Sequence, residues 1–152
     1  MKESIIKLVA VLTLAVSGVL FSSTSVAQDQ WPLVGGDYWE VTGIDIMDGG
    51  GWKYANWLAT EWKKELEFAK SKGWIKDYMI LANVYNRSDE PDLYLVSVVE
   101  DVPSAAEGEK RQKEYLEWQT KSIEKMVGES GNRAEYRTVM SSSLLQLLTI
   151  RE

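Results

Sequence analysis

The order in which strand-like and helix-like segments follow one another constrains the fold of this chain most. Four segments have the β-branched and aromatic composition or the alternation of strands: Tyr38–Met47, Trp74–Asn86, Asp92–Asp101 and Leu144–Arg151. Two segments have the apolar periodicity of helices, one over Tyr54–Lys72 and one that opens at Ser104. The resulting order is strand, helix, strand, strand, helix, strand. The leucines of the last segment would also suit a short helix.

Local signals support these elements. In the first helix Leu58, Trp62, Leu66 and Ala69 fall on one face, and Gly73 is the expected stop. Ser104 and Glu107 fit a capping box at the start of the second helix, whose apolar face runs to Val127 before the loop-like residues 128–132. The segment Asp92–Asp101 is apolar on both faces, which predicts a central strand.

This order is the split βαβ pattern of a ferredoxin-like α+β domain, with an antiparallel sheet and two helices on one face. We expect this domain over residues 37–152, after an N-terminal arm at residues 28–36 that contains Pro32 and two glycines. The face of the sheet without helices is rich in apolar side chains, so it needs cover. A second copy of the chain is the common solution, and the sequence therefore predicts a homodimer.

The first 27 residues are typical of a secretory signal peptide. Lys2 and Lys7 precede an apolar run from Leu8 to Phe21, and small residues end the segment at Ala27. The run has 14 residues, whereas a membrane-spanning helix needs about 20, so an uncleaved anchor is the weaker alternative. The segment predicts export to the bacterial periplasm or beyond, with no stable membrane anchor after cleavage.

Composition excludes several functions. The chain has no cysteine and no histidine, so we expect no Ser-His-Asp triad, no cysteine nucleophile, no histidine-ligated haem and no ordinary zinc site. No other catalytic, metal or cofactor constellation is evident. Residues 28–152 hold 15 basic and 22 acidic residues, a net charge of −7. An acidic domain of this kind does not favour nucleic acid.

The loop Asp48-Gly-Gly-Gly51 precedes a segment that holds three of the chain's seven tryptophans. The loop could hold an anion with its backbone amides, but the lysine and hydroxyl of a phosphate-binding loop are missing. Glycines that turn the chain from strand to helix are the simpler interpretation. Trp57 and Trp62 point about 140° apart on a helix. Trp62 then belongs to the core, and Trp57 lies where a ligand pocket or a dimer seam could form.

Some polar residues lie within strand-like segments, where each could face solvent or a cavity between sheet and helices. They are Asp45, Asn83, Tyr85, Ser97 and Glu100. Together with Trp57, we take Asp45, Asn83, Tyr85 and Glu100 as candidates for a ligand pocket. A buried carboxylate such as Asp45, which shares its strand face with Trp39 and Val41, could act as a base.

The order and lengths of the elements over Gly36–Glu152 resemble the dimeric α/β-barrel superfamily. Within it, the segment WEVTGIDI followed by a tryptophan-bearing helix looks most similar to NIPSNAP-like proteins and antibiotic-biosynthesis monooxygenases. The resemblance implies a homodimer with a pocket between sheet and helices, but no motif transfers a catalytic residue. The chain departs from the haem-binding branch, which requires a histidine.

Three functions fit these observations. The first is an exported dimer that binds a small apolar or aromatic ligand without catalysis. The second is a cofactor-independent enzyme of the monooxygenase or isomerase kind, with Asp45 or Asn83 in an enclosed pocket. The third is an interaction or structural protein of the cell envelope. We favour the first, because no catalytic constellation is evident in the sequence.

Overall fold

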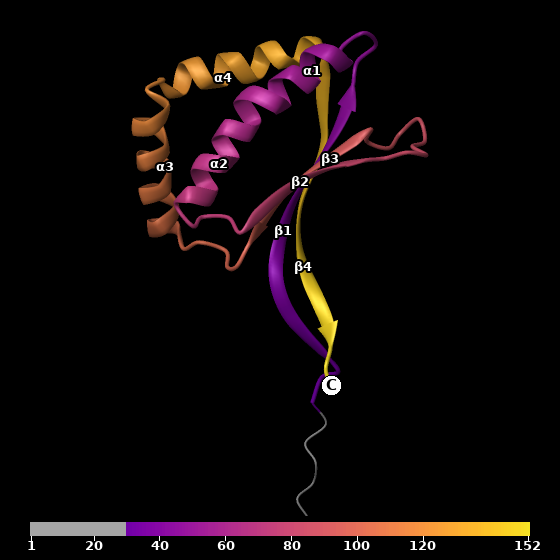
Figure 1. Cartoon of the computed structure of the whole chain (residues 1–152), viewed down its shortest axis with the longest axis vertical. Helices are drawn as coiled ribbons and strands as arrows, with labels where there is room; N and C mark the ends of the chain where they lie inside the picture. Colours follow the sequence, from indigo (N-terminus) through magenta and orange to yellow (C-terminus); the bar gives the residue numbers. More distant parts are fainter. Residues whose placement is uncertain (1–29) are drawn as a thin grey trace, which may run out of the picture. The chain divides into compact units, whose positions relative to one another are not determined.

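Four antiparallel strands form one sheet in the order β2-β3-β1-β4 (Figure 1). The computed structural model describes residues 30–152, so the expected signal peptide lies outside the described residues. The strands are β1 (Leu33–Ile46), β2 (Asp77–Ala82), β3 (Leu93–Val99) and β4 (Arg137–Ile150). The predicted α+β class and antiparallel sheet are confirmed, and β3 is central as expected. The strand order is compatible with a ferredoxin-like fold.

Three helices accompany the sheet in the described part of the chain. The first is continuous and consists of α1 (Gly51–Trp57), a π-helical turn η1 (Leu58–Trp62) and α2 (Lys63–Ser71). It is followed by Gly73, whose φ of 68° is the left-handed conformation that ends helices, as the sequence predicted. The others are α3 (Ala105–Gln119) and α4 (Ile123–Asn132), and a short 3-10 turn η2 (Arg133–Glu135) leads into β4.

The prediction of one uninterrupted helix after Ser104 was wrong. Ser104 caps α3 as expected, since its Oγ accepts a hydrogen bond from the Glu107 amide at 3.3 Å. The helix then stops at Thr120, which adopts a left-handed φ of 53°. Ser122 caps a new helix by accepting from the Lys125 amide at 3.2 Å. That helix, α4, continues through residues 128–132, where the sequence indicated a loop.

Thr120→Gly is expected to stabilise the protein by about 1 kcal/mol, because a β-branched residue pays a steric cost in the left-handed region that glycine avoids. Urea denaturation monitored by circular dichroism would measure the change. Thr60→Gly is the control, since Thr60 lies within the first helix and glycine there should destabilise by a similar amount. Destabilisation by Thr120→Gly would contradict the assignment of strain to this turn.

β1 and β4 are longer than the sequence indicated because they pair along their whole length. Leu33 lies opposite Ile150 at one end, and Ile46 lies opposite Arg137 at the other. β1 therefore begins within the stretch that we expected to be an arm. Since β3 pairs only with residues 38–44 of β1, residues 33–37 and 147–150 continue beyond it as two strands alone (Figure 1). We call this part the β1–β4 ribbon.

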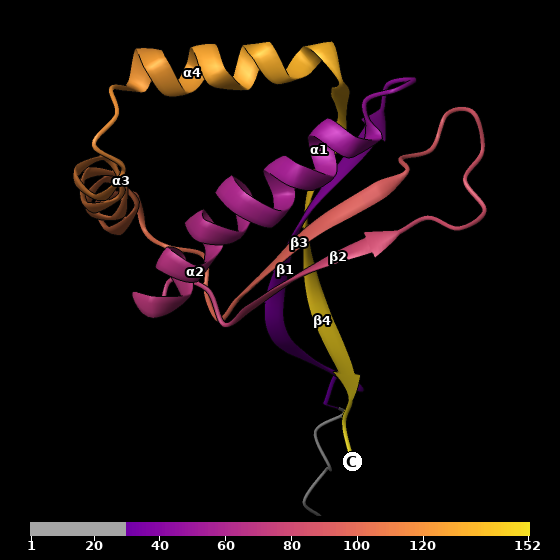
Figure 2. The same cartoon turned by 45° about the horizontal axis from the view of Figure 1, so that its top comes forward.

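The core lies where the first helix packs on the sheet. Ile44 of β1 and Leu95 of β3 form a buried cluster with Tyr54 and Leu58 of this helix. Figure 2 shows the helix lying across that face of the sheet. Because side chains alternate along a strand, Glu40 and the other even-numbered residues of β1 near Ile44 also face the helix side.

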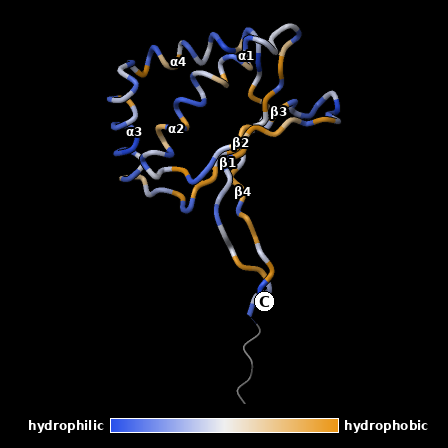
Figure 3. The backbone as a smooth tube through the Cα atoms, viewed as in Figure 1, coloured by the Kyte–Doolittle hydropathy of each residue, from blue (hydrophilic) through white to orange (hydrophobic). Residues whose placement is uncertain are grey.

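Large apolar side chains remain uncovered along β4 and the ribbon. Figure 3 shows hydrophobic residues following β4 toward its end. The side chains concerned are more than a third exposed: Val34, Val139, Met140, Leu144, Leu145, Leu147, Leu148 and Ile150. Consecutive leucines point to opposite faces of a strand, so both faces of this part of β4 are apolar and open. Within residues 30–152, no helix has the length and apolar character that crossing a bilayer requires.

Candidate functional site

A cavity of about 550 Å³ lies between the sheet and the first helix. We call it the sheet cavity. Its floor comes from β1, β3 and β4, and its roof from Trp62 at the end of η1 and Leu66 of α2. The lining residues are Glu40, Thr42, Trp62, Leu66, Leu95, Val96, Ser97, Ser142, Ser143 and Leu144. A cavity in this place is one of the two surroundings that the sequence allows for the polar strand residues, the other being solvent.

Strand register brings the polar groups of the sheet cavity together. Glu40 of β1 lies opposite Ser97 of β3, and the Ser97 Oγ donates a hydrogen bond to the Glu40 Oε2 at 3.2 Å. Thr42 lies opposite Ser142 of β4. On the roof, the Trp62 ring meets the Tyr78 ring edge to face, with 5.4 Å between their centroids. Glu40 is the only titratable group in this lining, which therefore pairs apolar walls with one carboxylate and several hydroxyls.

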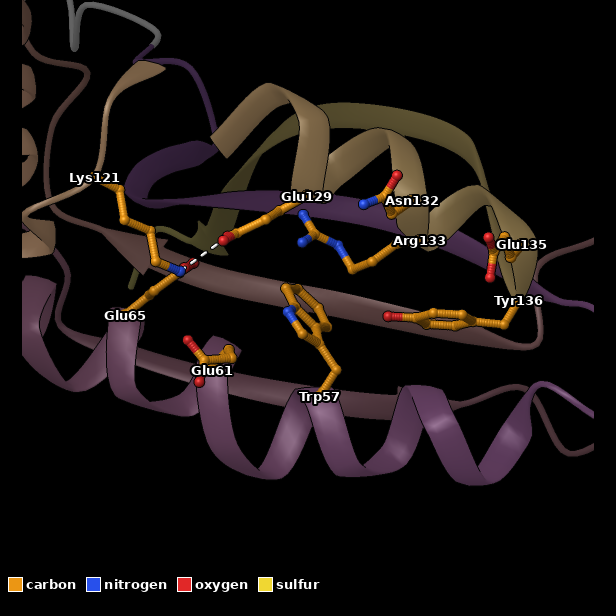
Figure 4. Close-up of a pocket in the computed structure, with 9 residues that line it drawn as sticks. All are labelled: Trp57, Glu61, Glu65, Lys121, Glu129, Asn132, Arg133, Glu135 and Tyr136. Carbon is orange, nitrogen blue, oxygen red and sulfur yellow. Dashed lines mark hydrogen bonds and ion pairs between the residues drawn. The ribbon is translucent and has the colours of Figure 1, made fainter. Parts of the chain in front are cut away.

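A second pocket, of about 460 Å³, lies between the first helix and α4 (Figure 4). We call it the helix cleft. Trp57, Glu61 and Glu65 enter it from the first helix, and the rest of the lining comes from the segment that begins just before α4 and ends at Tyr136. These remaining residues are Lys121, Glu129, Asn132, Arg133, Glu135 and Tyr136.

A stacked column holds the Arg133 guanidinium in the helix cleft. The Tyr54 ring stacks on the Trp57 ring, with 5.6 Å between centroids and 13° between planes. The Arg133 guanidinium carbon lies 4.4 Å from the Trp57 ring centroid, within the range of a cation–π contact. Its Nε is buried and has no hydrogen-bond partner among the described residues. Stacking on Trp57 therefore contacts this guanidinium where a hydrogen-bond acceptor is missing. A buried donor left unpaired costs about 1–3 kcal/mol.

Burial and hydrogen bonds set the protonation of the groups around Arg133. Burial raises the pKa of the Glu65 carboxyl, although hydrogen bonds from Tyr115 and Gln119 partly oppose this shift. The Gln119 Nε2 donates to the Glu65 Oε1 at 3.0 Å. Glu129 has the opposite shift, because the Lys121 Nζ lies 2.9 Å from its Oε2 and lowers its pKa. Burial raises the pKa of Tyr54 to about 12, so the phenol stays neutral in the cell's pH range.

The free energy of unfolding is expected to fall less steeply with rising pH in Glu65→Gln than in wild type. A carboxyl whose pKa is raised on folding binds its proton more tightly in the folded state. Its contribution is therefore most favourable below the unfolded pKa and declines as pH rises through the folded value. Urea denaturation across pH 4–8 should show wild type losing stability relative to Glu65→Gln over that window.

Glu129→Gln is the matched comparison with the opposite sign. The pKa of Glu129 is lowered on folding, so its ion pair with Lys121 contributes above the unfolded pKa and is lost as pH falls. The variant should therefore differ from wild type at neutral pH and converge with it in acid. Parallel pH profiles for Glu65→Gln and wild type would refute the assigned burial effect.

The structure does not bring the sequence-predicted site residues together. Trp57 lines the helix cleft, but Asp45 follows Ile44 in β1 and so points to the sheet face opposite the helices. Asn83 lies beyond β2, where its backbone N–H donates to the Asp92 backbone carbonyl at 2.8 Å. Tyr85 is 91% exposed, and Glu100 is exposed just after β3. Neither Asp45 nor Asn83 lines the sheet cavity.

The sequence reasoning missed Glu40 and Arg133. Glu40 could have been found, because it shares the alternation of Ile44 and Ile46 and is the one charged residue on that face of the strand. Ser97, one of the polar residues noted within the strand-like segments, is the hydrogen-bond partner of Glu40. Arg133 carried no signal, since it follows the glycines of a segment that reads as a loop. Its place depends on α4, which the sequence did not predict.

The described residues contain no cluster of three or more side chains suited to holding a metal ion. Comparison of the chain with protein-family models, with curated proteins and with solved structures gives no match.

Proposed function

We propose that the protein is exported to the periplasm and binds a small apolar or aromatic ligand, without catalysis, as a homodimer. The ligand would occupy the sheet cavity. The observation that carries this proposal is the composition of the cavity wall. Trp62, Leu66 and Leu144 supply apolar surface, and Glu40 with Ser97 supplies an acceptor that orients a donor group. Ligand sites in proteins combine apolar walls with a few placed polar groups in this way, in volumes of about 300–1,000 Å³.

The homodimer is supported by the β1–β4 ribbon and the uncovered length of β4. A two-stranded ribbon alone is marginally stable in water, and this one exposes leucines on both faces. β4 is also an edge strand, whose unpaired backbone groups invite further contact. A second copy related by a two-fold axis would place the same apolar residues against one another, which buries both sets at once. The ferredoxin-like arrangement of the sheet leaves a face available for this contact.

A cavity-filling variant tests ligand binding. The Ser142 side chain lines the sheet cavity from β4, so Ser142→Phe should abolish the change in tryptophan fluorescence produced by a small aromatic probe such as indole. Thr138→Phe is the control, because Thr138 is exposed on β4 opposite Asp45 and lies outside the cavity. If no probe in a panel of apolar and aromatic metabolites binds the wild type, the proposal fails.

Sedimentation tests the dimer. The purified protein should sediment as a dimer at micromolar concentration. The double variant Leu145→Lys, Leu147→Lys should sediment as a monomer, because it places charge on the exposed apolar surface of β4. Val84→Lys is the matched control, because Val84 is 77% exposed in the turn between β2 and β3. A wild-type monomer would exclude the homodimer while leaving the ligand proposal to its own test.

A further inference from the structure

The helix cleft is a second pocket, separate from the sheet cavity, and its charges point to a different ligand. We propose that it binds a small zwitterion of the α-amino acid class, with the ligand carboxylate on Arg133 and the ligand ammonium on Glu61. The two pockets lie on different sides of the first helix: Trp57 lines the cleft, whereas Trp62 lines the cavity. This inference does not depend on the ligand proposed for the sheet cavity.

Arg133 is the anchoring residue because its guanidinium is positioned but unpaired. The column of Tyr54 and Trp57 holds it in the cleft. The buried Nε has no partner, and among residues 30–152 no carboxylate forms an ion pair with this side chain, although four line the same pocket. A guanidinium presents parallel N–H donors that match the two oxygens of a carboxylate. The carboxylate of a bound ligand would supply the hydrogen-bond acceptor that Arg133 lacks in the described residues.

The carboxylates of the cleft explain why the ligand should not be a simple anion. Lys121 and Arg133 face four glutamates in the lining. Glu129 is engaged by Lys121 and Glu65 by Gln119. Glu61 makes no hydrogen bond or ion pair with its side chain in the described part of the protein, and Figure 4 shows it reaching from the helix toward the cleft that Arg133 enters. A ligand with only negative charge would be repelled by this excess of carboxylates, and one with only positive charge would leave Arg133 unpaired.

The steric and aromatic surroundings limit the rest of the ligand. Tyr54 stacks on the Trp57 ring and the Arg133 guanidinium lies over the same ring, which limits the ring surface left for the ligand. Tyr136 closes one end of the cleft (Figure 4). A pocket of about 460 Å³ accommodates any of the common amino acids, so the charged backbone groups, rather than the side chain, are the shared recognition element.

Isothermal titration calorimetry of the purified protein with each of the twenty common amino acids would test the proposal. For the amino acid that binds most tightly, the amine that lacks its carboxylate and the acid that lacks its ammonium should each bind about 10- to 100-fold more weakly, the range expected for loss of a charge-assisted hydrogen bond. For phenylalanine these probes are 2-phenylethylamine and 3-phenylpropionate. Absence of binding by every amino acid at about 5 mM, a very weak affinity, would overturn the proposal.

Variants locate the binding in the cleft. Arg133→Gln and Glu61→Gln should each weaken binding about 10- to 100-fold, while Arg87→Gln, whose side chain is 82% exposed outside the cleft, should leave it unchanged. Arg133→Lys keeps the charge but loses the paired donors, so it should weaken binding less, and it serves if Arg133→Gln fails to fold. Ser142→Phe should abolish binding in the sheet cavity alone. Full affinity in both Arg133 variants, or loss of amino acid binding in Ser142→Phe, would contradict the assignment.

Discussion

Replacing Tyr54 by alanine is expected to lower the free energy of unfolding by about 3–5 kcal/mol, the range for removing a large aromatic side chain from a core. Tyr54 is 1% exposed and is the largest of the fully buried side chains in the described residues. It fills the space between Ile44 and Leu58 in the core and also stacks on Trp57. Removing it therefore opens a cavity and frees the base of the column that holds Arg133.

Urea denaturation, followed by tryptophan fluorescence and circular dichroism together, would measure this loss. Tyr85→Ala is the matched control, because the same change is made at a side chain that is 91% exposed, and it should alter stability by less than about 0.5 kcal/mol. Since domains of this size are stable by only about 5–15 kcal/mol, Tyr54→Ala should remove a large part of the free energy of unfolding. Equal losses of stability in Tyr54→Ala and Tyr85→Ala would contradict the burial of Tyr54 in the core.

Gly50→Ala is expected to destabilise the protein by about 2–3 kcal/mol, through the overpacking that follows when a methyl group meets fixed backbone. A Cβ at this position would lie 2.9 Å from the Met47 carbonyl oxygen and closer still to that of Tyr136. These carbonyls cannot move freely. The Tyr136 oxygen accepts from the Met47 amide at 3.1 Å, and the Met47 oxygen accepts from the Gly50 amide at 2.8 Å. The methyl group would separate the start of the first helix from the start of β4.

Gly51→Ala is the control for Gly50→Ala and differs from it by one position. Nothing lies within 4 Å of a Cβ at Gly51, which is the first residue of α1, so alanine there should be neutral or slightly stabilising. Thermal unfolding of the two variants would show the contrast. A melting temperature for Gly50→Ala equal to that of Gly51→Ala would show that the loop can move away from β4.

The three glycines of this loop therefore have different roles, which composition alone does not distinguish. Gly49 has a left-handed φ of 75° and matches the turn that the sequence favoured. Gly50 has an ordinary helical φ of −79° and is needed for close packing. The close approach depends on Tyr136, which is far away in the sequence, so no local pattern could have predicted it.

The order of the elements was predictable because alternation and helical periodicity are local properties of the sequence. The β-branched and aromatic composition predicted the positions of β1 and β3, and the capping serine Ser104 predicted the start of α3. The lengths of β1 and β4 were not predictable, because they depend on pairing between Leu33 and Ile150 at opposite ends of the described chain. The break at Thr120 was also missed, since a threonine in the left-handed region contradicts its own preference.

The pockets were predictable only in part. The sequence places a sheet beside a helix but does not decide whether a cavity lies between them, and the lining residues depend on which face of β1 meets the helix. Alternation gives two sets of side chains and does not choose between the set with Asp45 and the set with Glu40. The choice is made by Ile44, which is buried against Tyr54. The helix cleft depends on the path of the chain after Thr120, which only the structure reveals.

The π-helical turn Leu58–Trp62 makes the first helix sensitive to the gain or loss of a single residue. Such a turn holds one residue more than an α-helical turn, so the segments on either side are out of phase by about 100°. Trp57 before the turn and Glu65 after it both line the helix cleft, while Trp62 and Leu66 line the sheet cavity. Deleting Ala59 would restore a regular helix, but it would rotate Trp57 away from Arg133 or Trp62 away from the sheet. Sequence change in this helix is therefore restricted to substitution, because an insertion or deletion would dismantle one of the two pockets.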